Sequence, residues 1–371
     1  MREIGVGIVG GGYMGKAHSV AMQAVGAVFN TALRPRLEMI CTSSPESAAA
    51  KAAEFGFSRH THDWRVLVED ERVEAIVIAT PQKLHRDIAL AAFDLGKPVF
   101  CEKPLGRNID DSREMVAAAE KSGVTNMTGF NYIRTPASQL AHKLIGDGAI
   151  GDITYFRGEH TEDFFSDPDQ PATWRNQGRA NGTMGDLAPH MINAALRLAG
   201  PIDTLCADIQ TVHEQRPSDD GPVTVTNDDQ AHFMCRFANG AMGQLFFSRV
   251  ATGRKMGYIY EISGTKGAIR FNQEDQNALW LYEADAAPEV RGFKKILTGP
   301  QHPDYLAFCQ GPGHGTGYQD QIIIEAKDFL TAIETGETVW PTFRDGMEVN
   351  QIVEAAWHSS EQSRWIEVSE I

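Results

Sequence analysis

Residues 1 to about 130 alternate short apolar runs with amphipathic segments rich in alanine. Strands that alternate with helices at this spacing form parallel βαβ units, with helices on both faces of the sheet. The predicted strands are Ile4–Val9, Leu37–Cys41, Ala75–Ala79, Val99–Cys101 and Thr125–Thr128, and the predicted helices are Gly15–Val25, Pro45–Phe55, Leu84–Leu95 and Asp110–Ser122. The pattern predicts an α/β domain with a doubly wound parallel sheet over residues 1–131.

After residue 131 the pattern changes to strands joined by short turns, such as Ala238-Asn239-Gly240. The predicted strands are Ile153–His160, Leu205–Thr211, Gln230–Phe237, Met242–Val250, Tyr258–Ser263, Ala268–Phe271 and Leu279–Tyr282, with helices at Pro136–Ile145, Leu187–Leu198, Gln319–Glu334 and Gly346–Gln362. This predicts a second α/β domain, residues 132–371, with an open, largely antiparallel sheet. Its C-terminal helices are candidates to pack back on the first domain, and Arg216–Asn227 is expected to be an exposed loop.

Helices on only one face of this second sheet leave the other face bare. Met242–Val250 carries large apolar side chains at positions that point to both faces. A second copy of the chain is the simplest cover for such a face, so we expect a homo-oligomer, either a dimer or a tetramer.

Composition limits the remaining possibilities. A chain of 371 residues with 42% hydrophobic residues fits two domains with sizeable cores. A net charge of −15 argues against binding to nucleic acid or to an anionic membrane. Five widely spaced cysteines without a C-x-x-C support neither disulfides nor a metal site. No apolar run spans a bilayer, and Ile4–Val9 is needed as a strand rather than a signal peptide, so we expect a cytoplasmic protein.

A glycine-rich turn follows the first predicted strand and opens the first predicted helix. Gly10, Gly12 and Gly15 form a G-x-G-x-x-G pattern, with Tyr13 and Met14 between the last two glycines. Gly10 permits the tight turn, Gly12 allows close approach of a pyrophosphate, and Gly15 allows helix and strand to pack closely. The helix N-terminus offers N–H groups to the phosphates. This predicts a dinucleotide-binding Rossmann domain.

The end of the second predicted strand bears on the choice of cofactor. An acidic residue there binds the ribose of NAD, whereas an arginine accepts the 2′-phosphate of NADP. Thr42 and Ser43 occupy this place, and their hydroxyls can bond a ribose but cannot neutralise a phosphate. The sequence favours NAD, while Arg34 and Arg36 nearby keep NADP open.

Two short stretches carry candidate catalytic residues. Lys103 comes just after Val99–Cys101, the fourth predicted strand of the first sheet, and carboxyl ends of such strands face the cofactor. The alternative is an ordinary surface lysine. Asp186 and His190 lie four residues apart at a predicted helix start, so they share a face, and histidine exchanges protons near neutral pH. The alternative is a helix cap at Asp186 and a structural histidine.

Six motifs in order, GGGYMG, ATPQKLH, CEKP, GFNYIR, TWR and GDLAPH, and a closing PTFRDGMEVNQIVEAAWHSS carry a family resemblance. Over essentially its whole length the chain resembles the glucose–fructose oxidoreductase/inositol dehydrogenase (Gfo/Idh/MocA) family. It is most similar there to inositol dehydrogenases, including the scyllo-inositol type that accepts L-glucose. The resemblance implies a Rossmann domain followed by an α/β domain whose open sheet makes dimer or tetramer contacts.

Carried over by position, Lys103 matches the family's catalytic lysine, and Asp186 and His190 match its D-x-x-x-H pair. The other cofactor contacts expected from the motifs are Ala79, Thr80, Pro81, His85, Glu102 and Asn131. The chain departs from the family at three places. Thr183 and Met184 follow Gly182 where the family has a glycine run, Asn193 replaces a common acidic residue, and so does Thr42.

The expected function is NAD-dependent oxidation of a secondary hydroxyl of a cyclic polyol or sugar, such as scyllo- or myo-inositol or L-glucose. His190 takes the hydroxyl proton, Lys103 stabilises the developing oxyanion, and Asp186 holds the hydroxyl or tunes the other two. Further expected substrate contacts are Asp163, Trp174, Arg175, Asn193, His314 and Tyr318. His314 lies in a glycine-rich stretch, 311–317. The alternative interpretation of this stretch is a flexible surface loop without a role in binding. Alternative functions are an NAD-dependent glycosidase and a non-catalytic dinucleotide sensor.

Overall fold

A computed structural model describes all residues, 1–371. The chain forms two compact units, one made of Met1–Arg134 and Gly317–Asn350, the other of Thr135–Thr316 and Gln351–Ile371. The first unit thus takes in residues 317–350, which the predicted boundary at residue 131 assigned to the second domain. Each unit is described by itself.

The first unit contains a parallel six-stranded sheet with the strand order β3-β2-β1-β4-β5-β6, the order of dinucleotide-binding sheets. Its strands are β1 (Arg2–Val9), β2 (Leu33–Cys41), β3 (Arg59–Thr61), β4 (Ala75–Ile78), β5 (Val99–Glu102) and β6 (Asn126–Gly129). Its helices are α1 (Tyr13–Phe29), α2 (Pro45–Phe55), α3 (Trp64–Glu69), α4 (His85–Asp94), α5 (Ile109–Ser122), α9 (Tyr318–Thr335) and the first part of α10 (Phe343–Gln362).

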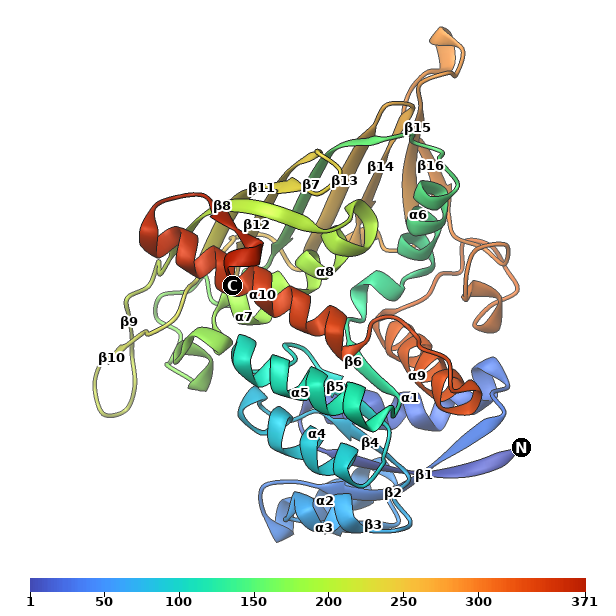
Figure 1. Ribbon diagram of the computed structural model, residues 1–371, viewed down its shortest axis with the longest axis vertical. Helices are drawn as coiled ribbons and strands as arrows, with labels where there is room; N and C mark the ends of the chain where they lie inside the picture. The colour runs from blue at the N-terminus through green and yellow to red at the C-terminus, as the bar shows by residue number, and fades with distance from the viewer. The chain divides into compact units, whose positions relative to one another are not determined.

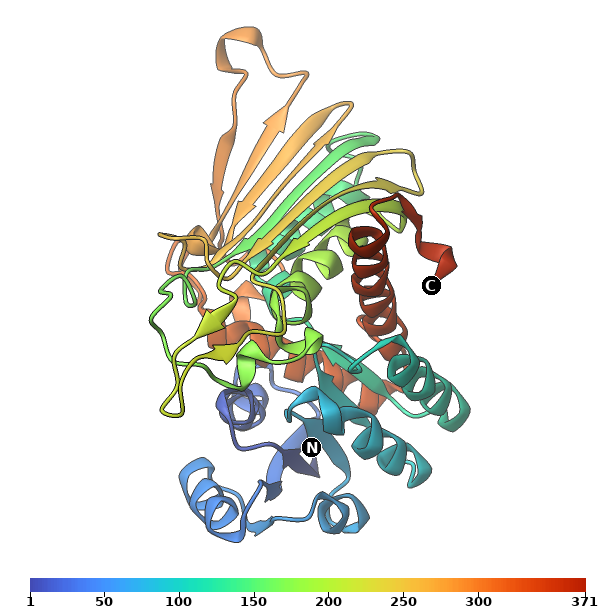
Figure 2. The ribbon, with the colours of Figure 1, turned by 90° about the vertical axis from the view of Figure 1, so that its left-hand side faces the viewer.

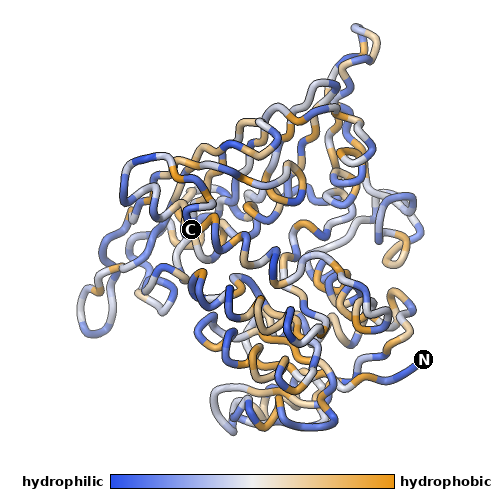
Figure 3. Tube along the Cα trace, viewed as in Figure 1, coloured by the Kyte–Doolittle hydropathy of each residue, from blue (hydrophilic) through white to orange (hydrophobic).

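Successive residues of a strand point to opposite faces, and β5 shows which helices cover each face of the first sheet. Phe100 contacts His18 of α1 and Phe329 of α9, with ring centroids 4.8 and 5.9 Å away. Val99 and Cys101 belong to the buried cluster that includes residues of α4 and α5. Figure 1 shows these two helices side by side in cyan, and Figure 3 shows apolar colour along the strands.

The first unit differs from the prediction in two respects, the start of β2 and the presence of β3 and α3. β2 begins at Leu33 rather than Leu37, because Arg34, Pro35 and Arg36 pair with β1 even though they break the apolar run. The short elements β3 and α3 were missed, because three to six residues carry too little periodicity. The side chain of Asp63 accepts from the Arg65 N–H and caps α3.

The second unit contains a nine-stranded sheet with the order β16-β15-β14-β13-β7-β12-β11-β8-β17. Only β7 and β12 run parallel; the other pairs are antiparallel. The strands are β7 (Ile153–Thr161), β8 (Ile202–Gln210), β11 (Gln230–Phe237), β12 (Met242–Ser248), β13 (Gly257–Gly264), β14 (Gly267–Asn272), β15 (Ala278–Glu283), β16 (Lys294–Leu297) and β17 (Ile366–Glu367), and the helices are α6 (Pro136–Gly146), α7 (Thr183–Asp186) and α8 (Ala188–Ala199). Figure 2 shows the strands side by side, with the orange loop between β15 and β16 extending beyond them.

Helices of this unit cover one face of the nine-stranded sheet. α8 packs on β7 and β12, and α6 packs on β14 and β15. Leu245 and Phe247 of β12 are buried on this side, whereas Met234, Met242 and Trp280 are exposed on the other. The predicted open sheet with one bare face is therefore present. None of the chain's helices is both long enough and apolar enough to cross a membrane.

The segment Arg216–Asn227, expected to be an exposed loop, is partly buried. It includes most of a small hairpin, formed by β9 (Gln215–Arg216) and β10 (Val223–Thr224). The guanidinium of Arg216 is buried and donates to the carbonyls of Phe165 and Asp167 at 2.6 and 2.8 Å. The expectation of exposure was wrong for Arg216 and Asn227, whose polar side chains find buried partners in the fold, whereas most of the remaining segment is exposed as expected.

Candidate active site

The glycine turn between β1 and α1 has the geometry of a phosphate cradle. Gly10 has φ +117°, and a Cβ there would lie 2.2 Å from the carbonyl oxygen of Ala79. A Cβ on Gly15 would lie 2.0 Å from the carbonyl oxygen of Gly10, whereas one on Gly12 would meet nothing within 4 Å. Gly10 and Gly15 are therefore required by packing, and Gly12 borders open space.

Polar groups around this open space fit a dinucleotide. α1 starts with no capping side chain and no acidic residue in its first turn, so its leading N–H groups remain available to an anion. At the end of β4, beyond Ala79 and before Pro81, the buried hydroxyl of Thr80 has no hydrogen-bond partner in the protein. The predicted cofactor residues Tyr13 and Met14 form the first turn of α1.

The carboxyl end of β2, where a ribose is expected, carries Thr42 and Ser43. Arg34 and Arg36 lie toward the opposite end of β2, where Arg34 donates to Asn30 at 2.7 Å and Arg36 pairs with Glu38. Neither arginine is thus placed to receive a 2′-phosphate. The end of β2 therefore fits NAD, the cofactor favoured by the sequence.

Lys103 follows β5, and its main chain is held from both sides. Glu102 is buried, with one carboxylate oxygen 2.7 Å from Nε2 of His18 and the other 3.3 Å from the Lys103 N–H. The Lys103–Pro104 peptide bond is cis. The ring of His85 approaches the carbonyls of Pro104 and Thr80 at 3.1 and 2.9 Å.

His85, expected from the motifs to contact the cofactor, lies completely inside the protein. Burial lowers the pKa of His85, so the ring is neutral near pH 7. Both ring nitrogens face main-chain carbonyls of the loops that follow β4 and β5. His85 therefore packs between these two loops, and because a neutral ring carries a single N–H, it donates a hydrogen bond to only one of them.

Tyr318, the first residue of α9, lies close to the glycine turn. Asn131 contacts α9. The Tyr318 ring, predicted from the sequence to contact substrate, lies 5.9 Å from that of Tyr13, and its hydroxyl is 3.5 Å from the sulfur of Met14. Burial raises the pKa of Tyr318, so its phenol stays protonated. The amide of Asn131 donates to Gln321 of α9 at 2.9 Å.

Glu325 is a buried acid of α9 that sequence reasoning missed. One carboxyl oxygen accepts from the Phe130 N–H at 2.7 Å, and the other has no partner. Burial and the neighbouring Glu102 raise the pKa of Glu325 well above its usual range. No local motif marks it, because its surroundings come from β5 and β6, far away in sequence.

In the second unit, Asp186 closes α7 and does not cap a helix. α8 begins at Ala188, one residue after the predicted start at Leu187, and Leu187 at its N-terminus supplies no capping side chain. The carboxylate of Asp186 instead pairs with Arg175 at 3.0 Å. The Arg175 guanidinium lies over the ring of the exposed Trp174, 4.6 Å from its centroid.

His190 is buried in the first turn of α8 and packs against a second histidine. Its ring lies 5.7 Å from that of His160, which comes from β7. His160 is in turn 2.9 Å from the Leu187 carbonyl and 3.2 Å from a carboxylate oxygen of Glu162. Sequence reasoning missed His160 and Glu162. Their spacing of two, which puts both on one face of a strand, was the available signal.

The other predicted substrate residues lie in varied surroundings. Asp163 is paired with Lys255 at 2.7 Å, and this hydrogen bond lowers the pKa of Asp163. Asn193 is buried, and its amide oxygen lacks a partner. His314 is exposed on the stretch 311–317, which the Tyr305 hydroxyl anchors by contacts to both Gly311 and Gly315. The structure brings together Trp174, Arg175 and Asp186, and no group of three acidic, His or Cys side chains is arranged for a metal.

The fold and the cradle define a class of protein that binds a nicotinamide dinucleotide. Residues 4–130 match a family described as an oxidoreductase family with an NAD-binding Rossmann fold. Residues 138–270 match the GFO/IDH/MocA C-terminal domain. The chain belongs to the GFO/IDH/MocA family of NAD-binding oxidoreductases, which confirms the resemblance drawn from the motifs and the predicted fold class.

Known relatives cover the whole chain. It is 40% identical to levoglucosan dehydrogenase of Pseudarthrobacter phenanthrenivorans over 100% of both chains, and 25% identical to inositol 2-dehydrogenase of Rhizobium meliloti over 98% of both. A solved levoglucosan dehydrogenase in complex with NADH and levoglucosan superimposes with a TM-score of 0.96 at 41% identity, covering 99% of each chain. The chain is therefore an NAD-dependent oxidoreductase of a family of sugar and polyol dehydrogenases.

Proposed function

We propose that the protein oxidises a secondary hydroxyl of a neutral ring sugar of the levoglucosan type. The observation that carries this is the 40% identity to levoglucosan dehydrogenase along the whole of both chains. The site residues support it, since the second unit holds a buried histidine and a carboxylate–guanidinium pair. The inositols predicted from the motifs are the second candidate, favoured by full-length relatives that act on them at 24–25% identity.

The catalytic roles follow from the chemistry of three residues. His190, with His160 and Glu162 behind it, accepts the hydroxyl proton. Lys103 donates a hydrogen bond to the oxygen on which negative charge develops. The bound nicotinamide supplies the hydride acceptor. Asp186, held by Arg175, accepts a hydrogen bond from the substrate hydroxyl and orients it.

We call the residues of the second unit around Asp163, Arg175, Asp186 and His190 the substrate side of the proposed site. The charges there fit a neutral substrate. Arg175 is paired with Asp186, Lys255 with Asp163, and the nearby Arg179 with Glu361. A phosphorylated sugar needs uncompensated cations to bind its phosphate, and these three are already matched to carboxylates. We therefore expect the enzyme to discriminate against sugar phosphates.

NADH formation by the purified protein tests the function. Levoglucosan, scyllo- and myo-inositol, D- and L-glucose and glucose 6-phosphate are each offered with NAD and with NADP. We expect turnover of a neutral ring compound with NAD and none of the phosphate ester. Binding of NAD without reduced cofactor from any compound contradicts the proposal and returns the choice to a glycosidase or a sensor.

We also propose that the bare face of the nine-stranded sheet binds a second copy of the chain. Met234, Met242 and Trp280 are exposed on it, and large exposed apolar side chains gathered on one face are typical of interfaces. Light scattering of Met234→Glu tests this, and we expect the variant to form a smaller species than wild type. Val66→Glu is the control, since Val66 is as exposed but lies on α3. A monomeric wild type contradicts the proposal.

A further inference from the structure

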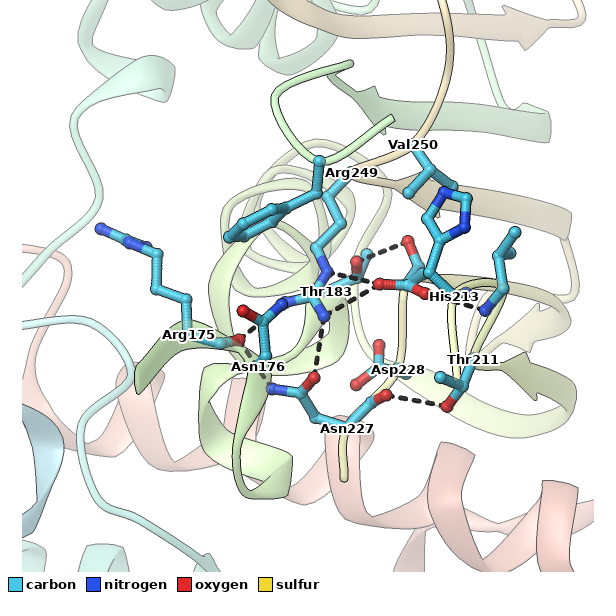
Figure 4. Close-up of polar contacts among 12 residues, drawn as sticks. Arg175, Asn176, Thr183, Thr211, His213, Asn227, Asp228, Arg249 and Val250 are labelled. Carbon is cyan, nitrogen blue, oxygen red and sulfur yellow. Dashed lines mark hydrogen bonds and ion pairs between the residues drawn. The ribbon is translucent and has the colours of Figure 1, made fainter. Parts of the chain in front are cut away.

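Beneath the substrate side lies a buried polar cluster that the catalytic roles leave unexplained. It joins the start of α7 and the segment around Arg175 to the end of β12, as Figure 4 shows. Arg249 is at its centre and is 2% exposed, and its partner Asp229 is fully buried. A buried ion pair rarely adds stability over an apolar pair of similar size, so stability alone does not explain why an arginine and an aspartate are paired here.

The guanidinium of Arg249 is used in full. Nε donates to Asp229 at 2.9 Å, and Nη2 donates to Asn227 at 2.8 Å. Nη1 donates to two main-chain carbonyls, that of Arg175 at 2.9 Å and that of Asn181 at 3.1 Å. One group of the arginine thus ties together both ends of the segment from residue 175 to residue 181.

The partners of Arg249 are themselves held in place. Asp229 accepts from the N–H groups of Val212 and His213 at 2.8 and 2.9 Å through the oxygen that does not face the arginine. The amide nitrogen of Asn227 donates to the Arg175 carbonyl at 2.8 Å, so that carbonyl is held twice. The cluster is therefore anchored to the chain that follows β8 and directed at the main chain of Arg175.

The same cluster holds the start of α7, which ends at Asp186. Asp228, the residue before Asp229, accepts a hydrogen bond from the Met184 N–H at 2.8 Å through its Oδ2 atom. The hydroxyl of Thr183 donates to the Asp229 carbonyl at 2.8 Å. The contacts of both Thr183 and Met184 therefore lead to this cluster.

We propose that Arg249 is a positioning residue for the substrate side of the active site. It fixes the main chain of Arg175 and, through Asp229, the start of α7, so that the Arg175–Asp186 pair meets the substrate in one orientation. The proposal rests on the proposed function, in which Asp186 contacts the substrate. A rigid substrate demands such fixed geometry, because a displacement of about 1 Å costs up to about 100-fold in rate.

Arg249→Lys is the decisive variant. Lysine keeps a positive charge for Asp229 but lacks the planar fork that reaches two carbonyls and Asn227 together. We expect kcat/KM for the sugar to fall by about tenfold or more, with the affinity for NADH, measured by fluorescence, unchanged. Equal kcat/KM in wild type and variant overturns the proposal.

Arg216→Lys is the matched control. Arg216 is equally buried and lies over the same Phe165 ring as Arg249, 5.0 and 4.9 Å from its centroid. It donates to the carbonyls of Phe165 and Asp167 and not to the segment 175–181. We expect both variants to lose thermal stability, and only Arg249→Lys to lose kcat/KM. An equal loss of kcat/KM in both overturns the proposal, because it marks a merely structural role.

A double-mutant cycle tests whether Arg249 acts through Arg175. In an Arg175→Ala background the further change Arg249→Lys should cost much less kcat/KM than it does in wild type. Additive losses overturn the proposal.

Hydrogen exchange keeps the test independent of turnover. We expect Arg249→Lys to speed amide exchange across residues 175–186 and Arg216→Lys to speed it across 165–170. Unchanged exchange at 175–186 overturns the proposal even if no substrate is found, whereas faster exchange with no turnover on any sugar counts against the proposed function alone.

Discussion

The cofactor side of this enzyme, at the glycine turn, and the proposed substrate side use different kinds of chemical group. On the cofactor side the decisive groups are main-chain atoms, namely the N–H groups at the start of α1 and the close contacts made possible by Gly10 and Gly15. On the substrate side the decisive groups are side chains, which other side chains hold in place, as Arg175 holds Asp186 and His160 packs on His190.

This difference teaches where change is tolerated. A main-chain cradle suits one cofactor and requires glycine at fixed positions, so it can hardly vary. A side-chain site, in contrast, is altered by single substitutions. Removing groups from each side should therefore give kinetically distinct failures.

The largest effects are expected at the reacting groups. His190→Ala should lower kcat by about 100- to 10,000-fold, since it removes the proton acceptor. Lys103→Ala should lower kcat by about 100- to 1,000-fold, since it removes the donor to the oxyanion. Steady-state NADH formation measures both.

The controls for these two variants are His358→Ala and Lys121→Ala, which lie away from the proposed site on α10 and α5. Fluorescence titration with NADH should give wild-type affinity for His190→Ala. Turnover near that of wild type in either catalytic variant would refute its assigned role.

A smaller loss is expected when the substrate-side pair is broken. Arg175→Ala leaves Asp186 without its 3.0 Å partner, so the carboxylate is no longer held in one orientation toward the substrate, and a misplacement of about 1 Å costs up to about 100-fold in rate. We expect kcat/KM for the sugar to fall by roughly 10- to 100-fold, with KM for NAD unchanged.

Arg179→Ala is the matched control for the pair. Arg179 belongs to the same unit and, like Arg175, is about half exposed, but its partner Glu361 has no proposed contact with the substrate. Exposed pairs contribute little, so kcat/KM should stay close to that of wild type. If the two variants behave alike, Arg175 has no special part in the site.

The features that could be predicted from the sequence depend on local pattern, whereas those that were missed depend on contacts between distant residues. β11 was predicted with its observed ends, and the parallel sheet and its glycine turn were predicted because they depend on local periodicity and local backbone needs. The burial of Arg216 and the partners of Arg249 were not, because they join residues 20 to 74 positions apart. Catalytic candidates such as His190 were found by motif, and their support from His160 was not.

On the cofactor side, two glycines separate folding from binding. Gly12→Ala adds a Cβ where no protein atom lies within 4 Å, so the protein should fold normally. The added methyl occupies the space of the bound dinucleotide, and such crowding costs about 1–3 kcal/mol, which raises KM for NAD by about tenfold or more. Initial rates at varied NAD measure this, and kcat at saturating NAD should change less.

Gly10→Ala should fail differently. Its φ of +117° and the 2.2 Å approach of a Cβ to the Ala79 carbonyl both oppose any side chain. Strain of this kind costs about 1–3 kcal/mol in stability before the clash is counted, so we expect a lower Tm as well as weaker NAD binding. A variant with wild-type Tm would show that the turn relaxes, and the main-chain cradle would then be less exacting than we argue.

The smallest expected effect lies on the substrate side and concerns the slope of stability against pH. Burial raises the pKa of Asp228 from the usual 3.8 to about 6, although the Met184 N–H favours the charged form. In the unfolded chain this carboxyl loses its proton near its usual pKa, so between about pH 4 and pH 6 the folded state binds more protons than the unfolded state. Stability contributed by Asp228 is therefore full below pH 4 and is lost as the pH rises to 6, by at most about 3 kcal/mol.

Asp228→Asn removes this titration while keeping an oxygen that accepts from Met184. Thermal unfolding of wild type and variant at pH 4 and pH 7 should show the variant gaining a few degrees in Tm relative to wild type at the higher pH. The neighbours Arg249 and Asp229 are present in both proteins, so the difference isolates one carboxyl. Parallel Tm profiles would mean that Asp228 is ionised throughout, and that the cluster under the substrate side stabilises one more charge than its burial suggests.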